Sequence, residues 1–219
     1  LEIQYNAYGK EHPDNVNMLC NLANTMIKKG NNKQAEEYLI EAVRITKEKL
    51  GIVHPNYVSA ILMLGVFYYE TGSYDKTEKY YLEALEKYRN IYGEKNSNYS
   101  TALSNLGTLY LAKAVQTVNE KEATEWTNKA VDYFTGAIKV DSATIGMEHP
   151  DYASHLNNLA ELYRNTGQFD KAEPLYLKTI EIEKKVFGEN YPDIAVTYHN
   201  LSLLYSGASM LDKAEEYCL

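Results

Sequence analysis

Apolar residues recur along this chain at the spacing of amphipathic helices. One run is followed, after Thr71-Gly72-Ser73, by a second run that ends at Gly93. The first run is Val58, Ile61, Leu62, Leu64, Gly65, Tyr68 and Tyr69, and the second is Thr77, Tyr80, Tyr81, Ala84, Leu85 and Tyr88. Spacings of three and four residues place such positions on one buried helical face, whereas a strand would alternate every second residue. The pattern therefore predicts an all-α chain of paired helices with almost no β-structure.

A short motif separates successive helix pairs and sets the repeat length. It combines a glycine, which suits the end of one helix, with a proline, which suits the first turn of the next. Its copies are Gly9–Asp14, Gly51–Asn56, Gly93–Asn98, Gly146–Asp151 and Gly188–Asp193, the third of which lacks the proline. Counted at the histidine position, the copies lie at 12, 54, 96, 149 and 191, so the steps are 42, 42, 53 and 42 residues. A period of this size indicates a stack of similar two-helix units, none of which could bury its apolar face alone.

The period predicts how the chain is divided. We expect a right-handed superhelical solenoid of antiparallel helix pairs, with repeats at 10–51, 52–93, 94–146 and 147–188 and partial repeats at 1–9 and 189–219. Both partial repeats end inside an expected helix, so we expect further repeats or domains of the same chain beyond both ends. In such an array the functional surface runs along the stacked units rather than into one compact pocket.

The third unit carries eleven extra residues, near 113–126. Leu111, Val115 and Val118 continue the apolar stripe of its first helix, and Ala123 and Trp126 begin that of the second. We expect Asn119 to cap the second helix, with Glu122 at the third helical position and Val118 packed against Ala123 as a hydrophobic staple. The insertion thus predicts a hairpin of two lengthened helices. Trp126, the only tryptophan, would either seal this hairpin or contact a partner.

Composition narrows the classes of function. The chain of 219 residues is 45% hydrophobic and 24% charged, as in ordinary folded proteins. Its net charge is −8 and it has no basic run, so neither nucleic acid nor direct membrane contact is expected. No apolar stretch has the length of a membrane span, and nothing at Leu1 resembles a signal peptide. Cys20 and Cys218 form no disulfide or metal pattern and suit a reducing compartment. We therefore expect a cytoplasmic protein.

Residues that could carry catalysis do not form a recognisable set. His12, His54 and His149 recur at the same place in different repeats, so they are expected to pack or to cap helices rather than to bind one metal ion. His155 and His199 lack cysteine or carboxylate partners at ligand spacing. There is no nucleophile with a base and an orienting group, and no glycine-rich phosphate loop. We expect no enzyme, no metal and no cofactor in this segment, although an enzyme domain elsewhere on a longer chain stays open.

The cores of the predicted helices support a family resemblance. The first helices contain Leu22-Ala23 with Met26, Leu64-Gly65 with Tyr68, Leu106-Gly107 with Tyr110, Leu159-Ala160 with Tyr163, and Leu201-Ser202 with Tyr205. The second helices hold a small residue at Ala35, Thr77, Ala130, Ala172 and Ala214. This arrangement resembles the tetratricopeptide repeat in its longer, 42-residue form, and residues 149–188 are similar to a repeat of the kinesin light chain. The resemblance covers essentially the whole chain.

The resemblance implies a binding surface. In such proteins the first helices line a concave groove, and in the kinesin light chain family an asparagine before the Leu-Ala pair helps to hold a peptide backbone. The matching positions here are Asn21, Met63, Asn105, Asn158 and Asn200. A carboxamide both donates and accepts hydrogen bonds, so it can pair with any peptide unit. The alternative is that these asparagines bond neighbouring helices and hold the repeats in register.

Further candidate positions in this groove differ in chemistry along the chain. They are Asn24, Leu62, Val66, Tyr69, Asn157, Arg164 and His199. Leu62, Met63, Val66 and Tyr69 form an apolar island that would receive an apolar side chain. Chaperone-binding members of the superfamily hold a terminal carboxylate with several cations, but Cys20, Leu62 and Ser104 stand at those positions here. Such a clamp is therefore not expected, and Lys28 and Arg164 are the plausible groove cations.

These observations predict a non-catalytic module for protein–protein interaction that binds an extended partner segment in the groove. The alternative is a structural scaffold subunit whose edges dock folded partners in a cytoskeletal or ciliary assembly. A third class is an autoregulatory arm of a larger enzyme.

Overall fold

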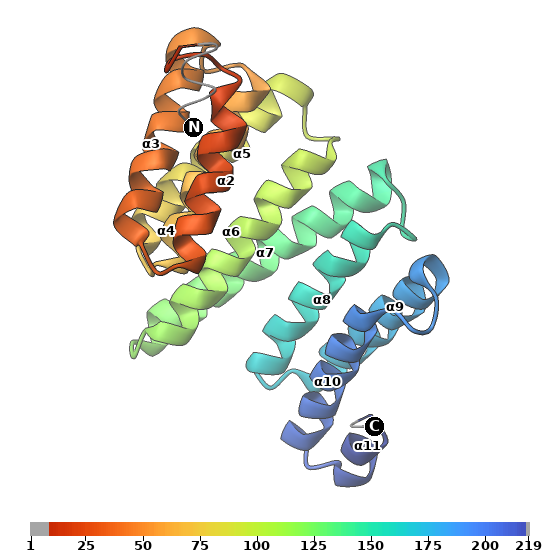
Figure 1. The fold of residues 1–219 in the computed structure, drawn as a ribbon. Coiled ribbons are helices and arrows are strands. Elements are labelled where there is room, and N and C mark those ends of the chain that lie inside the picture. Colours follow the sequence, from red (N-terminus) through yellow and green to blue (C-terminus); the bar gives the residue numbers. More distant parts are fainter. Residues whose placement is uncertain (1–8, 218–219) are drawn as a thin grey trace. The chain divides into compact units, whose positions relative to one another are not determined.

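Helices make up most of the described chain. The computed structural model describes residues 9–217, and within that range it contains ten α-helices and no strand (Figure 1). They are α2 (Asn15–Lys28), α3 (Asn32–Lys49), α4 (Pro55–Glu70), α5 (Tyr74–Tyr92), α6 (Ser97–Gln116), α7 (Glu120–Thr144), α8 (Pro150–Asn165), α9 (Phe169–Phe187), α10 (Pro192–Gly207) and α11 (Leu211–Glu216). The prediction of an all-α fold is confirmed.

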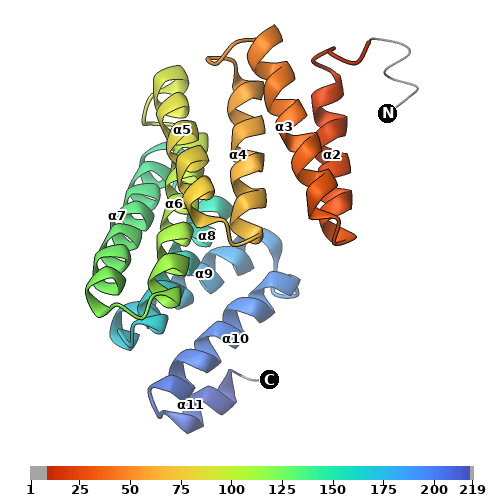
Figure 2. The same ribbon diagram turned by 90° about the vertical axis from the view of Figure 1, so that its left-hand side faces the viewer.

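The chain forms two compact units, which are described separately. Unit 1 spans residues 1–93 and contains α2 to α5, and unit 2 spans residues 94–219 and contains α6 to α11. In unit 1, α2 packs on α3 and α4 packs on α5 as antiparallel pairs, and α3 also contacts α4 (Figure 2). In unit 2 the pairs α6–α7, α8–α9 and α10–α11 are joined by contacts of α7 with α8 and of α9 with α10. Each unit therefore stacks helix pairs as the predicted solenoid requires.

The recurring motif acts as a helix stop followed by a helix start. Gly51 adopts φ = 87°, a conformation that L-residues with a side chain rarely adopt. Three residues later, His54 Nδ1 accepts a hydrogen bond from the Asn56 backbone N–H at 3.1 Å. His149 caps α8 in the same way. His54 and His149 were expected either to pack or to cap helices, and the structure shows that they cap them.

The Leu-Gly pairs are explained by the packing of the second helix on the first. A Cβ atom added to Gly65 would lie 2.7 Å from Tyr81 Cδ1, and one added to Gly107 would lie 2.7 Å from Phe134 Cδ1. Real Cβ atoms do not approach so closely, so an aromatic ring fills the space that a side chain would need. The core of each pair is thus set by a small residue on the first helix facing a large one on the second.

The lengthened hairpin predicted for the third repeat, residues 94–146, is present. Helix α6 has 20 residues where α4, α8 and α10 have 16, and α7 has 25 where α5 and α9 have 19. Asn119 caps α7, since its side-chain oxygen accepts from the backbone N–H groups of Lys121 and Glu122 at 3.1 and 3.3 Å. The predicted hydrophobic staple is wrong, because Val118 is fully exposed in the turn. The two hydrogen bonds that Asn119 accepts cap the start of α7 without a staple.

Trp126 lies on α7 near the tip of this hairpin and is half-buried. The Lys113 ammonium group of α6 lies 5.7 Å from the centre of its ring, so the tryptophan helps to join the two arms. The ring keeps some exposed surface, and a partner contact stays a prediction. Two other expectations, the helix end at residues 1–8 and any role of Cys218, lie outside the described residues.

Candidate protein-binding faces

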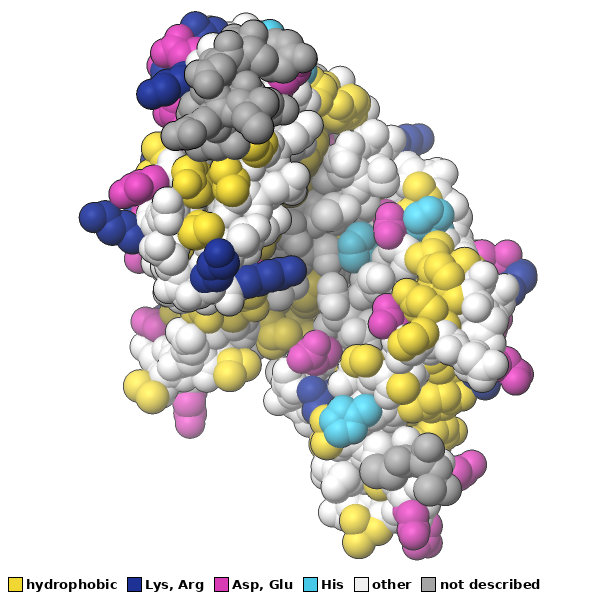
Figure 3. Space-filling view, in the orientation of Figure 1, with side chains coloured by type: hydrophobic (Ala, Val, Ile, Leu, Met, Phe, Trp, Pro, Cys, Tyr) yellow, Lys and Arg dark blue, Asp and Glu magenta, His cyan; other side chains and the backbone are white. Residues whose placement is uncertain are grey.

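The first helices of unit 1, α2 and α4, contact each other and present one set of candidate residues. We call these residues the unit 1 face: Asn21, Asn24, Leu62, Met63, Val66 and Tyr69. Asn21, Asn24 and Val66 are exposed, and the other three are half-buried. The α4 part is the apolar island predicted from the sequence. Lys or Arg side chains gather at the carboxyl end of α2, where Lys28 lies (Figure 3).

The first helices of unit 2, α6, α8 and α10, also contact one another in sequence order. Their candidate residues, the unit 2 face, are Asn105, Asn157, Asn158, Arg164, His199 and Asn200. His199 is exposed and the other five are half-buried. Over α8 and α10 the visible surface is mostly uncharged, with single acidic, basic and histidine side chains scattered in it (Figure 3). Unit 2 therefore presents hydrogen-bonding groups at positions where α4 of unit 1 presents apolar carbon, while α2 of unit 1 presents Asn21 and Asn24.

Asn158 has a partner on a neighbouring first helix. Its side-chain Nδ2 donates to the Ser104 hydroxyl at 3.2 Å, which ties α8 to α6. This contact favours a register role for Asn158. The Asn157 side chain next to it has its Oδ1 buried without a hydrogen-bond partner among the described residues. Adjacent asparagines thus differ, since one bonds within the protein and the other keeps a free acceptor.

Arg164 is a cation near the carboxyl end of α8, within the unit 2 face. Its side chain is 20% exposed, and its contact with Glu161 is long, at 3.9 Å. Its Nε is buried and has no hydrogen-bond partner within residues 9–217. Behind it lies Tyr176 of α9, where burial raises the pKa of the phenol to about 12 and the nearby guanidinium partly opposes that shift. The guanidinium therefore keeps an N–H donor, at Nε, that is unpaired among the described residues.

Sequence reasoning missed the contacts between successive helix pairs. Tyr68 of α4 donates its hydroxyl to Glu36 of α3 at 2.5 Å, and the same positions in unit 2 are Tyr205 of α10 and Glu173 of α9, at 2.6 Å. We call this contact the Tyr–Glu joint. A signal was present, since Glu36 and Glu173 both follow the small residue of a second helix, but nothing in one helix shows which tyrosine it meets.

A second missed contact is a buried acid–histidine pair. Asp141 of α7 and His155 of α8 approach to 2.6 Å between Oδ2 and Nδ1, with side chains 0% and 7% exposed. At the next joint, Thr197 of α10 donates to Glu183 of α9 at 3.1 Å. Burial raises the pKa of the Glu183 carboxyl. His155 had been set aside as lacking a partner at ligand spacing, and its partner proved to be 14 residues away on another helix.

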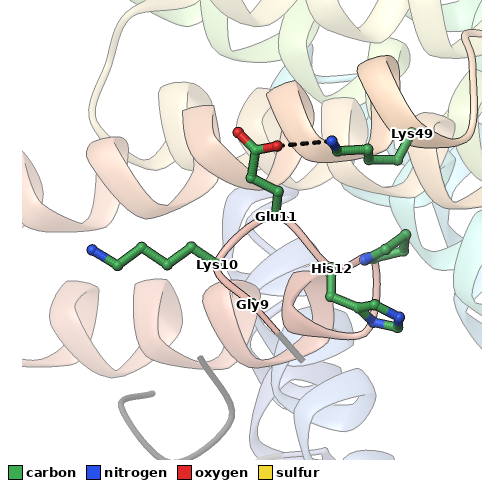
Figure 4. Close-up of a pocket in the computed structure, with 6 residues that line it drawn as sticks. Gly9, Lys10, Glu11, His12 and Lys49 are labelled. Atoms are coloured by element: carbon green, nitrogen blue, oxygen red, sulfur yellow. Dashed lines mark hydrogen bonds and ion pairs between the residues drawn. The ribbon is translucent and has the colours of Figure 1, made fainter. Parts of the chain in front are cut away.

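Unit 1 also contains a shallow open pocket (Figure 4). It is lined by Gly9, Lys10, Glu11, His12, Pro13 and Lys49, in the loop before α2 and at the end of α3. Glu11 and Lys49 form an ion pair of 2.7 Å across it, and that hydrogen bond lowers the pKa of the Glu11 carboxyl. The pocket contains no candidate binding residue.

Two other classes of site would need metal ligands or a membrane-spanning helix. Within residues 9–217, no group of three or more His, Cys, Asp or Glu side chains is placed to hold a metal ion. None of the helices described has both the length and the apolar character of a membrane span.

Comparison with protein-family models gives one description. Models described as tetratricopeptide repeat match residues 16–56, 57–114, 127–182 and 151–217. These ranges cover most of the chain and leave out residues 115–126, at the tip of the lengthened hairpin. No curated protein matches the chain.

Solved structures with the same fold come from several kinds of protein. A protein of Podosopora anserina, described as a kinesin light chain with nearly identical TPR-like repeats, has a TM-score of 0.74 at 19% identity, over 94% of this chain and 92% of that one. BtubC (BKLC) from P. vanneervenii has a TM-score of 0.76 at 21% identity, over 94% and 77%. A Rap protein complexed with competence and sporulation factor has a TM-score of 0.65 at 14% identity, over 99% and 65%. At these identities the likeness shows a shared fold.

Proposed function

Because the chain belongs to the tetratricopeptide repeat family, we propose that it is a non-catalytic interaction module that binds an extended segment of a partner protein along its first-helix faces. The partner is a protein or peptide. The unit 1 face receives an apolar side chain of such a segment, and the unit 2 face receives backbone amides. A cytoplasmic location, with a cytoskeletal or ciliary association, belongs to the same proposal and is supported by the likeness to kinesin light chain structures.

One observation carries the proposal. On α8, Asn157 Oδ1 and Arg164 Nε are buried and lack hydrogen-bond partners among the described residues. Seven residues separate them, which is close to two helical turns, so they lie on the same side of the helix. Unpaired buried polar groups are rare because each one costs free energy. Both side chains are only half-buried as a whole, so a turn of each toward solvent would let a bound backbone, which offers N–H and C=O groups, pair this acceptor and this donor.

The exposed faces support the same proposal. None of the twelve candidate residues is buried, although each lies on a helix that packs into a core. Val66 is 37% exposed, and Val196 and Leu203 of α10 are 59% and 40% exposed. Exposed apolar side chains beside hydrogen-bonding groups are typical of peptide sites.

The scaffold alternative has its own supporting observation. Val115 and Val118, at the tip of the α6–α7 hairpin, are 68% and 102% exposed. Apolar residues at a projecting tip suit contact with a folded partner. In that alternative the hairpin and the second helices bind, and the first-helix faces do not.

Selection from a random peptide library displayed on phage separates the two functions. We expect the protein to select peptides, and crosslinks from a photoreactive copy of the best one to fall on α4, α8 and α10. Met63→Ser with Val66→Ser should weaken this peptide, and Val115→Ser with Val118→Ser is the matched control. Crosslinks on the hairpin and second helices, with affinity lost only in the control variant, would favour the scaffold.

A further inference from the structure

Inside the two units, three joints connect a second helix to the first helix of the next pair. They are α3 with α4 in unit 1, and α7 with α8 and α9 with α10 in unit 2. The α3–α4 and α9–α10 contacts each include the Tyr–Glu joint defined above, in which the hydroxyl and carboxylate oxygens are 2.5 and 2.6 Å apart. In both, a lysine from the following helix lies over the tyrosine ring, Lys76 at 4.4 Å and Lys213 at 4.9 Å from its centre. The same contact of three residues thus recurs at equivalent positions in different units.

The α7–α8 joint lacks this contact. Its tyrosine is Tyr163, and Lys171 lies over that ring at 5.2 Å as expected. The position of the glutamate, however, is occupied by Val131, which follows the small residue Ala130 just as Glu36 follows Ala35. A valine cannot accept a hydrogen bond, so the tyrosine hydroxyl has no acceptor from this position of α7.

The same joint instead contains the pair Asp141–His155. The equivalent residues of the α3–α4 joint are Thr46 and Ala60, of which Thr46 bonds only within its own helix, to the Ala42 and Val43 carbonyls. Asp141 and His155 are both buried, and Asp141 Oδ1 has no hydrogen-bond partner among the described residues. The imidazole is therefore the partner that compensates for burial of the carboxyl group.

A contact of this kind constrains rotation as well as distance. Apolar side chains tolerate small sliding movements, because their attraction has no direction. A buried carboxyl group that depends on one ring nitrogen does not, since a small rotation of α8 about its axis would break its hydrogen bond. His155 also lies three residues before Asn158, whose amide reaches Ser104 of α6. The orientation of α8 set at its α7 side thus decides where its face toward α6 points.

We propose that Asp141 and His155 are positioning residues that fix the rotation of α8 and so align Asn157, Asn158 and Arg164 on the unit 2 face. They replace the Tyr–Glu joint in the one repeat that carries the lengthened hairpin. The alignment of the helices stands independently of any ligand, and its consequence for peptide affinity rests on the proposed function.

The test converts this joint into that of unit 1 in the full chain. Asp141→Thr with His155→Ala installs the residues of the α3–α4 joint, and adding Val131→Glu installs its glutamate opposite Tyr163. Two readouts report the orientation of α8 without a ligand: the NMR resonances of the Asn158 side-chain amide, and hydrogen-exchange protection along α8. We expect the double variant to shift the amide resonances and to lower protection tenfold or more, and the triple variant to restore both.

Tyr205→Phe is the matched control, since it removes a hydrogen bond at another joint of the same unit. It should lower protection at α9 and α10 and leave the Asn158 resonances in place. A folded double variant with unchanged Asn158 resonances and unchanged α8 protection would overturn the proposal. If the double variant does not fold, a folded triple variant supports the proposal and an unfolded one contradicts it.

Peptide affinity separates this inference from the proposed function. A peptide selected by the wild-type protein should bind the double variant about tenfold more weakly and the triple variant nearly as well as wild type. If no peptide binds unit 2 of the wild-type protein, the proposed function fails while the NMR result still decides the positioning role.

Discussion

The two units use the same helix pair to present different chemistry. In unit 1 the row position before the Leu-Ala pair is Asn21 on α2 but Met63 on α4, where it lies next to Leu62 and Val66. In unit 2 the equivalent positions hold Asn105, Asn158 and Asn200. The backbone at these positions is helical throughout, so the difference lies in the side chains alone. The comparison teaches that one repeat scaffold can present apolar carbon on one first helix and carboxamides on others, which under the proposed function would bind a side chain and a peptide backbone respectively.

The contacts between successive helix pairs also differ, since those of unit 2 bury ionisable side chains and that of unit 1 does not bury them at the same positions. The α3–α4 joint of unit 1 has Thr46 and Ala60 at its buried centre, whereas the two joints inside unit 2 have Asp141 with His155 and Glu183 with Thr197. Buried ionisable groups must keep their partners, while apolar contacts can repack. Unit 2 should therefore tolerate substitutions at its joints less well than unit 1.

The largest effects should come from matched leucines in the two cores. Leu64 of α4 and Leu106 of α6 occupy equivalent positions and are 1% and 0% exposed. Replacing either by alanine should cost about 2–5 kcal/mol of unfolding free energy, because it removes packed methyl groups and leaves a cavity. Trp126 fluorescence reports unit 2, and far-UV circular dichroism reports all helices. Leu106→Ala should lower the midpoint seen by fluorescence more than Leu64→Ala does. Equal shifts from both variants would show that the units unfold as one.

The apolar island should give the next largest effect. Met63→Ser with Val66→Ser should weaken a selected peptide by roughly tenfold to a hundredfold, because each apolar side chain buried on binding contributes about 1.5–3 kcal/mol at most. Isothermal titration calorimetry measures the affinity. Ile40→Ser is the matched control, since Ile40 is exposed on the second helix α3. An equal loss in the control variant would place the binding surface on the second helices.

Acid should change the stability of the two units differently, because the pKa of Glu36 is lowered in unit 1 and the pKa of Glu183 is raised in unit 2. In unit 1 the Tyr68 hydroxyl bond lowers the pKa of Glu36, so the stability that Glu36 contributes is present at neutral pH and is lost as pH falls through its folded-state pKa. In unit 2 burial raises the pKa of Glu183, so its contribution is full at low pH and is lost as pH rises through that raised value. Ion pairs lower the pKa of Glu41 in unit 1 and of Glu148 in unit 2, and salt screens both.

Between pH of about 6 and about 4, unit 1 should therefore lose more stability than unit 2. Hydrogen exchange, corrected for the intrinsic pH dependence of the exchange rate, measures this for α4 and α10 separately. Glu183→Gln should stabilise unit 2 at neutral pH, and Glu36→Gln should reduce the acid sensitivity of unit 1. A destabilising Glu183→Gln at neutral pH would contradict the assigned sign.

Much of the local structure could be predicted from the sequence. The 42-residue period, the glycine stops, the histidine caps and the capping of α7 by Asn119 follow from side chains within a few residues of each other. The lengths of both hairpin arms also followed, because apolar spacing continued through the insertion. The packing of Val118 was wrong, since a staple needs a surface to cover and the turn offers none.

Contacts between helices could not be predicted in the same way. Asp141 with His155, Glu36 with Tyr68 and Asn158 with Ser104 join residues 14, 32 and 54 positions apart. Periodicity shows which face of a helix is buried, but the partner of a polar side chain depends on the rotation and offset of two packed helices. Each candidate binding residue could thus be placed on a face, while its freedom to bind a ligand depended on contacts that only the structure shows.

The asparagine row tests the central claim most directly. Asn158→Ala with Asn200→Ala should weaken a selected peptide by roughly fivefold to a hundredfold, because each lost hydrogen bond is worth about 0.5–1.5 kcal/mol. Asn200→Ala alone isolates the ligand contact from the Asn158–Ser104 bond inside the protein. Affinity by calorimetry and melting temperature should be measured on the same samples. The account predicts a clear loss of affinity with a small thermal shift for Asn200→Ala. A large thermal shift, with affinity per folded molecule unchanged, would contradict it.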